Sequence, residues 1–142
     1  MSPDGLNTVN NGEWEDVELA VDSGASETVI NEGMVASVRI QEGEASIRGV
    51  EYEVANGVRT PNQGEKRFIG VSSEGISRKL AAQVCDANKG MLNMSKLKRG
   101  GGSRVVLDAG GPFIEDKRIG GRMNLSENNG MYMITLWTKK GV

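Results

Sequence analysis

Asp22 stands between an apolar run and a turn-forming sequence. Residues 19–21, Leu-Ala-Val, precede it, and Ser-Gly-Ala-Ser follows it. A carboxylate after a buried strand, next to glycine and hydroxyl groups, suits an aspartate held at the floor of a cleft. Glycine allows the sharp turn, and the hydroxyls can orient the carboxylate by hydrogen bonds. The alternative is an ordinary surface turn, which Asp-Ser-Gly also forms. The apolar residues on both sides of the motif favour the functional interpretation.

Counting residues excludes several other kinds of catalytic site. The 142-residue chain has no histidine and one cysteine, Cys85. Ser-His-Asp triads, Cys-His dyads, histidine-based zinc sites and disulfides are therefore absent. We expect Cys85 to be a small buried hydrophobic residue, because no base is available to activate it. Catalysis in this chain must use other groups, and we predict no metal and no organic cofactor.

The motif at Asp22 resembles the active-site signature of retropepsins, the aspartic proteases of retroviruses and retrotransposons. Residues 91–97, Met-Leu-Asn-Met-Ser-Lys-Leu, are similar to a segment of copia-type retrotransposon proteases. The similarity covers residues 17–137, and residues 31–49 match only loosely. It implies an all-β, retropepsin-like acid protease fold: a closed β-barrel or sandwich with a flap hairpin, one short helix and a C-terminal β-meander.

The resemblance also implies which residues form the site. Asp22, Ser23 and Gly24 take the catalytic positions. The flap hairpin, residues 50–60, is expected to fold over an extended peptide substrate and to pair with its backbone. The residues expected to contact substrate are Ala25, Ser26, Val54, Ala55, Asn56 and Gly57.

Aspartic proteolysis requires two carboxylates that share one proton. The ionised carboxylate activates a water molecule, and the protonated one donates a hydrogen bond to the peptide carbonyl. One motif per chain supplies a single carboxylate, so we expect a two-fold homodimer in which the two Asp22 side chains meet. Its substrate would be an extended peptide or a polyprotein. A competing hypothesis is an inactive binding or assembly module with the same fold, and a third is a plain β-domain whose Asp22 lies exposed in a turn.

Asp108 also follows an apolar strand-like run and invites comparison with Asp22. A single-chain enzyme using both aspartates would need two similar lobes, but only 34 residues follow Asp108. Ala109 also lacks the hydroxyl that Ser23 provides. The homodimer is therefore the preferred hypothesis, with Asp108 in a hairpin turn.

Apolar alternation predicts the elements that position these residues. Residues 14–21 alternate as a strand does, and residues 68–71 and 80–85 are expected to form paired strands. Asn56-Gly57 predicts a β-hairpin with a two-residue type I′ turn. The spacing of apolar residues over 91–97, followed by three glycines, predicts one short helix. Residues 29–40 leave strand and helical turn open, and residues 104–137 predict a meander of strands.

Composition limits the partners and divides the chain. Twenty glycines indicate a turn-rich β protein. Seventeen basic and nineteen acidic residues give a net charge of -2, which predicts no nucleic-acid partner. No segment is apolar enough to cross a membrane, so we expect a cytoplasmic protein with reduced Cys85. We divide the chain into a flexible N-terminal arm, 1–13, a protease core, 14–103, and a C-terminal β extension packed on the core, 104–142.

Overall fold

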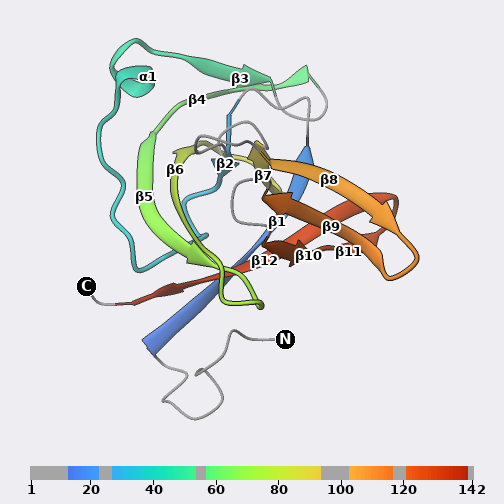
Figure 1. The fold of residues 1–142 in the computed structure, drawn as a ribbon. Coiled ribbons are helices and arrows are strands. Elements are labelled where there is room, and N and C mark those ends of the chain that lie inside the picture. Colours follow the sequence, from blue (N-terminus) through green and yellow to red (C-terminus); the bar gives the residue numbers. More distant parts are fainter. Residues whose placement is uncertain (1–12, 23–26, 54–56, 94–102, 117–120, 141–142) are drawn as a thin grey trace.

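The computed structural model describes residues 13–22, 27–53, 57–93, 103–116 and 121–140, and strands dominate it (Figure 1). This confirms the all-β prediction. The described strands are β1 (Trp14–Asp22), β2 (Val29–Ile30), β3 (Glu51–Glu53), β4 (Arg59–Pro61), β5 (Gly64–Val71), β6 (Ser77–Val84), β7 (Gly90–Asn93), β8 (Ser103–Asp108), β9 (Gly111–Asp116), β10 (Arg122–Asn124), β11 (Ser126–Asn128) and β12 (Met131–Lys139). Within the described residues the one helix is α1 (Glu44–Ile47), and none is long and apolar enough to cross a membrane.

The largest sheet has the strand order β1-β7-β2-β6-β5-β12-β11. β12 also pairs antiparallel with β1, from Trp14↔Lys139 to Ala20↔Met133, so the C-terminal strand belongs to the same sheet as the first. β7 lies between the consecutive strands β1 and β2, parallel to β1 and antiparallel to β2. β1 and β2, which are consecutive in the sequence, are therefore not neighbours in the sheet, because the later strand β7 lies between them.

The predicted closed barrel is not found. β12 pairs with β1 over most of its length, but it meets β5 at a single residue pair, Trp137↔Val71. The described pairing of β5 with β12 stops at that pair, and β5 and β6 curve strongly (Figure 1). An unbroken hydrogen-bond ladder around the whole circumference, which a barrel needs, is missing there.

The predicted helix over residues 91–97 is wrong for its first three residues, which belong to strand β7. Residues 94–102 lie outside the described part of the chain. β7 is enclosed by β1 and β2, and Leu92 is fully buried. A Cβ atom at Gly90 would come within 2.5 Å of Leu19 Cδ2, so any larger residue at this position would force the buried Leu19 side chain to shift. Packing between distant segments overrides the helical spacing of the local sequence.

The predicted hairpin is present as β3 and β4, but its described register does not match an uninterrupted two-residue turn. The pairs run from Glu51↔Pro61 to Glu53↔Arg59. Five residues separate Glu53 from Arg59, whereas a two-residue turn leaves an even number between paired residues. Gly57 has a φ of +73°, which glycine adopts without strain. The rest of the predicted tip, residues 54–56, lies outside the described residues.

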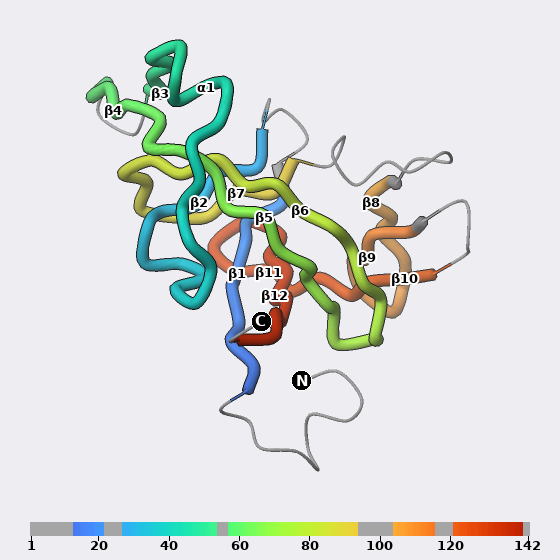
Figure 2. The backbone as a smooth tube through the Cα atoms, turned by 90° about the vertical axis from the view of Figure 1, so that its left-hand side faces the viewer, coloured from blue at the N-terminus to red at the C-terminus, as the bar shows by residue number. Residues whose placement is uncertain are grey.

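One hydrophobic cluster extends from the main sheet to the C-terminal strands. It includes Leu19, Val84, Leu92 and Leu136 of the large sheet, together with Ile114 from β9. β8, β9 and β10 form a small antiparallel meander in the order β10-β9-β8. Figures 1 and 2 show this meander and the β3–β4 hairpin at separate places on the main sheet.

The buried side chain of Lys66 fixes the loop that follows β2. Lys66 occupies an inward position of β5, and its Nζ donates hydrogen bonds to the carbonyl oxygens of Glu32, Met34 and Val35 at 2.9, 2.9 and 3.0 Å. Val35 has a φ of +52°, an unfavourable conformation for a β-branched residue. Burial lowers the pKa of Lys66. The three carbonyl oxygens accept the hydrogen bonds that the ammonium group would otherwise donate to water. These bonds also hold the strained loop against β5.

The N-terminal arm predicted for residues 1–13 lies outside the described residues except for Glu13. The carbonyl oxygen of Glu13 accepts a hydrogen bond from the backbone N–H of Lys140 at 2.6 Å. This contact continues the pairing of β1 with β12 by one step beyond Trp14. The start of β1 is therefore attached to the end of the last strand.

Candidate active site

Asp22 is the last residue of β1, two residues past the last pair that β1 forms with β12. β12 lies on one side of β1 and β7 on the other, and the preceding residues Leu19 and Ala20 are fully buried. The parallel register places Asp22 opposite Asn93, the last residue of β7. The Asp22 side chain and the predicted site residues Ser23, Gly24, Ala25 and Ser26 lie outside the described part of the structure. The backbone of Asp22 therefore lies beside the end of the parallel strand β7.

Thr28 holds the far end of the loop that starts at Asp22. Its side chain is 1% exposed, and its Oγ1 accepts a hydrogen bond from the backbone N–H of Asn93 at 3.1 Å. Asn93 is therefore next to both Asp22, by strand pairing, and Thr28, by this hydrogen bond. The loop between them begins and ends at the same point of β7. Sequence reasoning missed Thr28; the only available signal was a hydroxyl residue directly before the apolar pair Val29-Ile30.

A side-chain network joins the segment after Asp22 to the hairpin. The Tyr52 hydroxyl, on β3, donates a hydrogen bond to Glu27 Oε2 at 2.7 Å. Asn62 Nδ2 donates to the Tyr52 hydroxyl at 2.9 Å and to Gln83 Oε1, on β6, at 2.8 Å. Asn62 Oδ1 accepts from the N–H of Gly64 at 2.7 Å. Three segments that are distant in sequence are thereby tied together.

Burial and the hydrogen bond to Glu27 raise the pKa of Tyr52 to about 12. Tyr52 is consequently a neutral hydrogen-bond donor at neutral pH, and its hydroxyl donates to the Glu27 carboxylate. Sequence reasoning also missed this network. It identified the hairpin but did not assign a role to Tyr52 or Asn62, because their partners lie 25 and 21 residues away along the chain.

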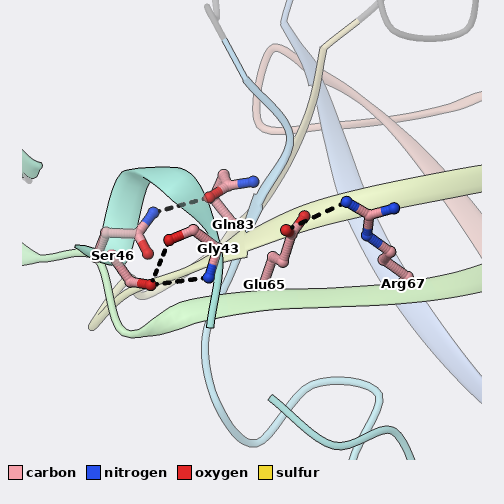
Figure 3. Close-up of polar contacts among 6 residues, drawn as sticks. Gly43, Ser46, Glu65, Arg67 and Gln83 are labelled. Atoms are coloured by element: carbon pink, nitrogen blue, oxygen red, sulfur yellow. Dashed lines mark hydrogen bonds and ion pairs between the residues drawn. The ribbon is translucent and has the colours of Figure 1, made fainter. Parts of the chain in front are cut away.

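The base of the hairpin is fixed on a second side by Thr60. Thr60 is 5% exposed, and its Oγ1 accepts a hydrogen bond from the backbone N–H of Asp86 at 3.1 Å. At the start of α1, Ser46 Oγ forms hydrogen bonds with both the N–H and the carbonyl oxygen of Gly43 at 2.9 Å, near Gln83 (Figure 3). The Thr60 hydrogen bond therefore attaches β4 to the segment that follows β6.

The hairpin lies at the same end of the main sheet as the end of β1 (Figure 1). Of the four hairpin residues predicted to contact substrate, Val54, Ala55 and Asn56 lie outside the described residues. Gly57 is described and exposed. The contact between Tyr52 and Glu27 brings the hairpin base next to the segment after Asp22, as a flap over the site would require.

Asp108 occupies a different environment. It is exposed, in the turn between β8 and β9, where its Oδ1 accepts a hydrogen bond from the Gly110 N–H at 2.8 Å. Its Oδ2 lies 3.9 Å from Arg122 Nη1. Cys85 is buried as expected, and burial raises the pKa of its thiol. Among the described side chains there is no group of three that could hold a metal ion.

Comparison of the chain with family models, with curated proteins and with solved structures found no match.

Proposed function

We propose that this protein is an aspartic endopeptidase that works as a homodimer, with one Asp22 from each subunit. The observation that carries the proposal is the position of Asp22 at the end of β1, two residues after the fully buried Ala20 and opposite Asn93 of the parallel strand β7. A surface turn would not need fully buried residues such as Leu19 and Ala20 just before it. The resemblance of residues 22–26 to the retropepsin signature supplies the reaction class.

In the proposed reaction the two Asp22 carboxyl groups share one proton. The ionised carboxylate removes a proton from a water molecule, whose oxygen attacks the carbonyl carbon of the substrate peptide. The protonated carboxyl group donates a hydrogen bond to the carbonyl oxygen, where negative charge develops. The tetrahedral intermediate then breaks its C–N bond, and a proton passes to the leaving amine. Ser23 and Gly24 are proposed to orient Asp22 and to let the chain turn beside it.

The hairpin of β3 and β4 is proposed to cover an extended substrate. Val54, Ala55, Asn56 and Gly57 would contact the peptide from the hairpin, with Ala25 and Ser26 on the opposite side. The hydrogen bonds from Tyr52 to Glu27 and from Asn62 to Gln83 support this role, because they fix the hairpin base beside the segment that follows Asp22. The expected substrates are extended peptides, including the polyprotein of a copia-type element, in the cytoplasm.

The test compares the wild-type protein with Asp22→Asn on a peptide library at mildly acidic pH. The substitution removes the shared proton without changing side-chain size, so activity should fall by about 10²- to 10⁴-fold. Circular dichroism should show an unchanged fold. Sedimentation equilibrium should show a dimer at the protein concentration used for the assay. Retained activity in Asp22→Asn would rule out the mechanism.

The alternative, an inactive binding or assembly module, predicts a different pair of results. The wild-type protein would then bind peptides without hydrolysing them, and Asp22→Asn would bind them equally well. A monomer at tens of micromolar, on the order of concentrations at which weak dimers form, would favour this alternative.

A further inference from the structure

Strand β5 has an outer edge that is open along its middle. β6 covers the other edge of β5 from Gly64 to Val71. On the outer side, Glu65 exchanges two backbone hydrogen bonds with Gln41, each 2.8 Å long, and Val71 pairs with Trp137. Backbone groups of alternate residues point to the same side of a strand. The N–H and carbonyl groups of Arg67 and Ile69 therefore face outward, as those of Glu65 do.

Within the described residues, no strand covers Arg67 and Ile69 on this outer side. The open stretch runs from residue 66 to residue 70, about 16 Å at the usual rise per residue. The Gln41 bridge closes it at one end and the Trp137 pair at the other. Ile69 is 51% exposed although it lies on a long central strand. An open, apolar edge of this kind is a template for another strand.

A groove of about 750 Å³ lies along this edge. One wall is β5, and the other is formed by the loop residues 37–41, which diverge from β5 after the Gln41 bridge. Trp14, Val38 and Val71 supply apolar surface to the groove. The groove is large enough for a peptide segment and has both apolar and polar lining.

The loop wall of the groove is held in place by contacts that do not depend on a ligand. Lys66 donates hydrogen bonds to the carbonyl oxygens of Met34 and Val35, just before this wall. The backbone N–H of Ser37 donates to the Glu15 carboxylate at 3.2 Å. The groove is therefore preformed, and a ligand would not need to order it.

The charged groups lining the groove are all positive. They are Arg39, Arg67 and Lys139, and no acidic side chain is among the described residues that line it. Arg67 Nη2 pairs with Glu65 Oε1 at 3.3 Å (Figure 3), whereas Arg39 and Lys139 form no ion pair with any described residue. A ligand carrying carboxylates would complement this rim, although the whole chain has a net charge of -2.

We propose that the outer edge of β5 binds an extended acidic peptide of a partner protein as an added strand. The peptide backbone bonds to Arg67 and Ile69, its alternate apolar side chains enter the groove toward Trp14 and Val38, and its carboxylates meet Arg39 and Lys139. The added strand continues the sheet at the place where the described pairing of β5 with β12 stops. This site is distinct from Asp22 and does not depend on peptidase activity.

The experiment uses the full chain and a fluorescein-labelled peptide with the sequence Glu-Val-Asp-Leu-Glu, followed by fluorescence anisotropy. Only every second peptide N–H faces β5 in an added strand. One modified peptide carries N-methyl groups on Val and Leu, and a second carries one on Asp. One of these two peptides should lose binding completely, and the other should bind as the unmodified peptide does. Equal loss or equal retention in the two peptides would overturn the proposal, as would the absence of saturable binding.

Protein variants test the same site from the other side. Arg39→Glu and Lys139→Glu should each weaken binding by about two- to five-fold, the size expected for exposed charges. Lys89→Glu, an exposed lysine in the turn before β7, is the matched control and should leave binding unchanged. Ile69→Pro removes the outward N–H and should abolish binding, whereas Ile69→Ala should preserve it. If Ile69→Pro does not fold, the methylated peptides decide the question.

Hydrogen exchange distinguishes a peptide ligand from a second copy of the chain. The amides of Arg67 and Ile69 should exchange rapidly in the free protein and slowly after the peptide is added. Slow exchange before any peptide is present, lost on dilution together with a decrease in sedimenting mass, would show that another copy occupies the edge. That result would overturn the proposal.

Discussion

Asp22 and Asp108 both end a strand and both directly follow apolar residues, yet their surroundings differ. Asp22 ends β1, which has a strand on each side and fully buried residues at Leu19 and Ala20. Asp108 ends β8, an edge strand of the meander, where Leu107 is 64% exposed. The same local pattern thus gives a buried strand end in one place and a surface turn in the other.

The sharpest way to break this comparison is to remove each carboxylate in turn. Asp22→Asn should lower the rate of peptide hydrolysis by about 10²- to 10⁴-fold, and Asp108→Asn should leave it unchanged. When Asp22→Asn subunits are mixed with wild-type subunits, the activity should fall below the fraction of wild-type subunits in the mixture, because mixed dimers carry only one Asp22. Equal losses in the two variants would instead indicate that Asp22 and Asp108 act together in one chain.

The second contrast concerns the leucines that precede the two aspartates. Leu19→Ala should lower the free energy of unfolding by about 2–5 kcal/mol, because it opens a cavity between β1 and β7. Leu107→Ala, on the exposed strand, should change it by less than about 0.5 kcal/mol. Urea denaturation followed by tryptophan fluorescence measures both. Similar values for the two variants would mean that β1 is not buried more deeply than β8.

The local pattern of apolar residues was sufficient to predict several strands. β1 has alternating apolar residues, and the two short apolar runs 68–71 and 80–85 were expected to form paired strands, as β5 and β6 do. The β7 assignment failed because its cause is not local. Gly90 permits contact with Leu19, 71 residues earlier, and the sequence near Gly90 gives no sign of it.

The candidate site was predictable only at its centre. The motif at Asp22 is contiguous, so its residue types could be read directly. The supporting groups Thr28, Tyr52 and Asn62 act through partners on other strands, and each is an ordinary polar residue in its own segment. The inward position of Lys66 was equally hidden, because its three carbonyl partners become neighbours only after the sheet curves.

The third contrast concerns the hydrogen bonds near each aspartate. Thr28→Val keeps the shape of the side chain but leaves the buried N–H of Asn93 without its acceptor. The free energy of unfolding should fall by about 1–3 kcal/mol. Asp108→Ala removes an exposed hydrogen bond to Gly110, and water replaces it, so the cost should stay below about 0.5 kcal/mol. A larger cost for Asp108→Ala than for Thr28→Val would reverse the comparison.

The smallest effect expected is the pH dependence of the Tyr52 network. The pKa of Tyr52 is raised to about 12, above its ordinary value of 10.0, so the folded state holds this proton more tightly than the unfolded state. The stabilisation is therefore complete below pH 10 and is lost as the pH rises from about 10 to 12.

Tyr52→Phe should cost about 1 kcal/mol at neutral pH, the usual net value of a hydrogen bond. This difference from the wild type should shrink between about pH 10 and 12, where phenolate forms in the unfolded protein first. Urea unfolding across this range measures it, and ultraviolet absorbance of phenolate, taken as the difference from Tyr52→Phe, locates the titration. Leu107→Ala introduces no titrating group and should differ from wild type by the same small amount throughout. A Tyr52→Phe difference that is also independent of pH would mean that Tyr52 donates no buried hydrogen bond to Glu27, and the hairpin base would then be no more firmly fixed than the Asp108 turn.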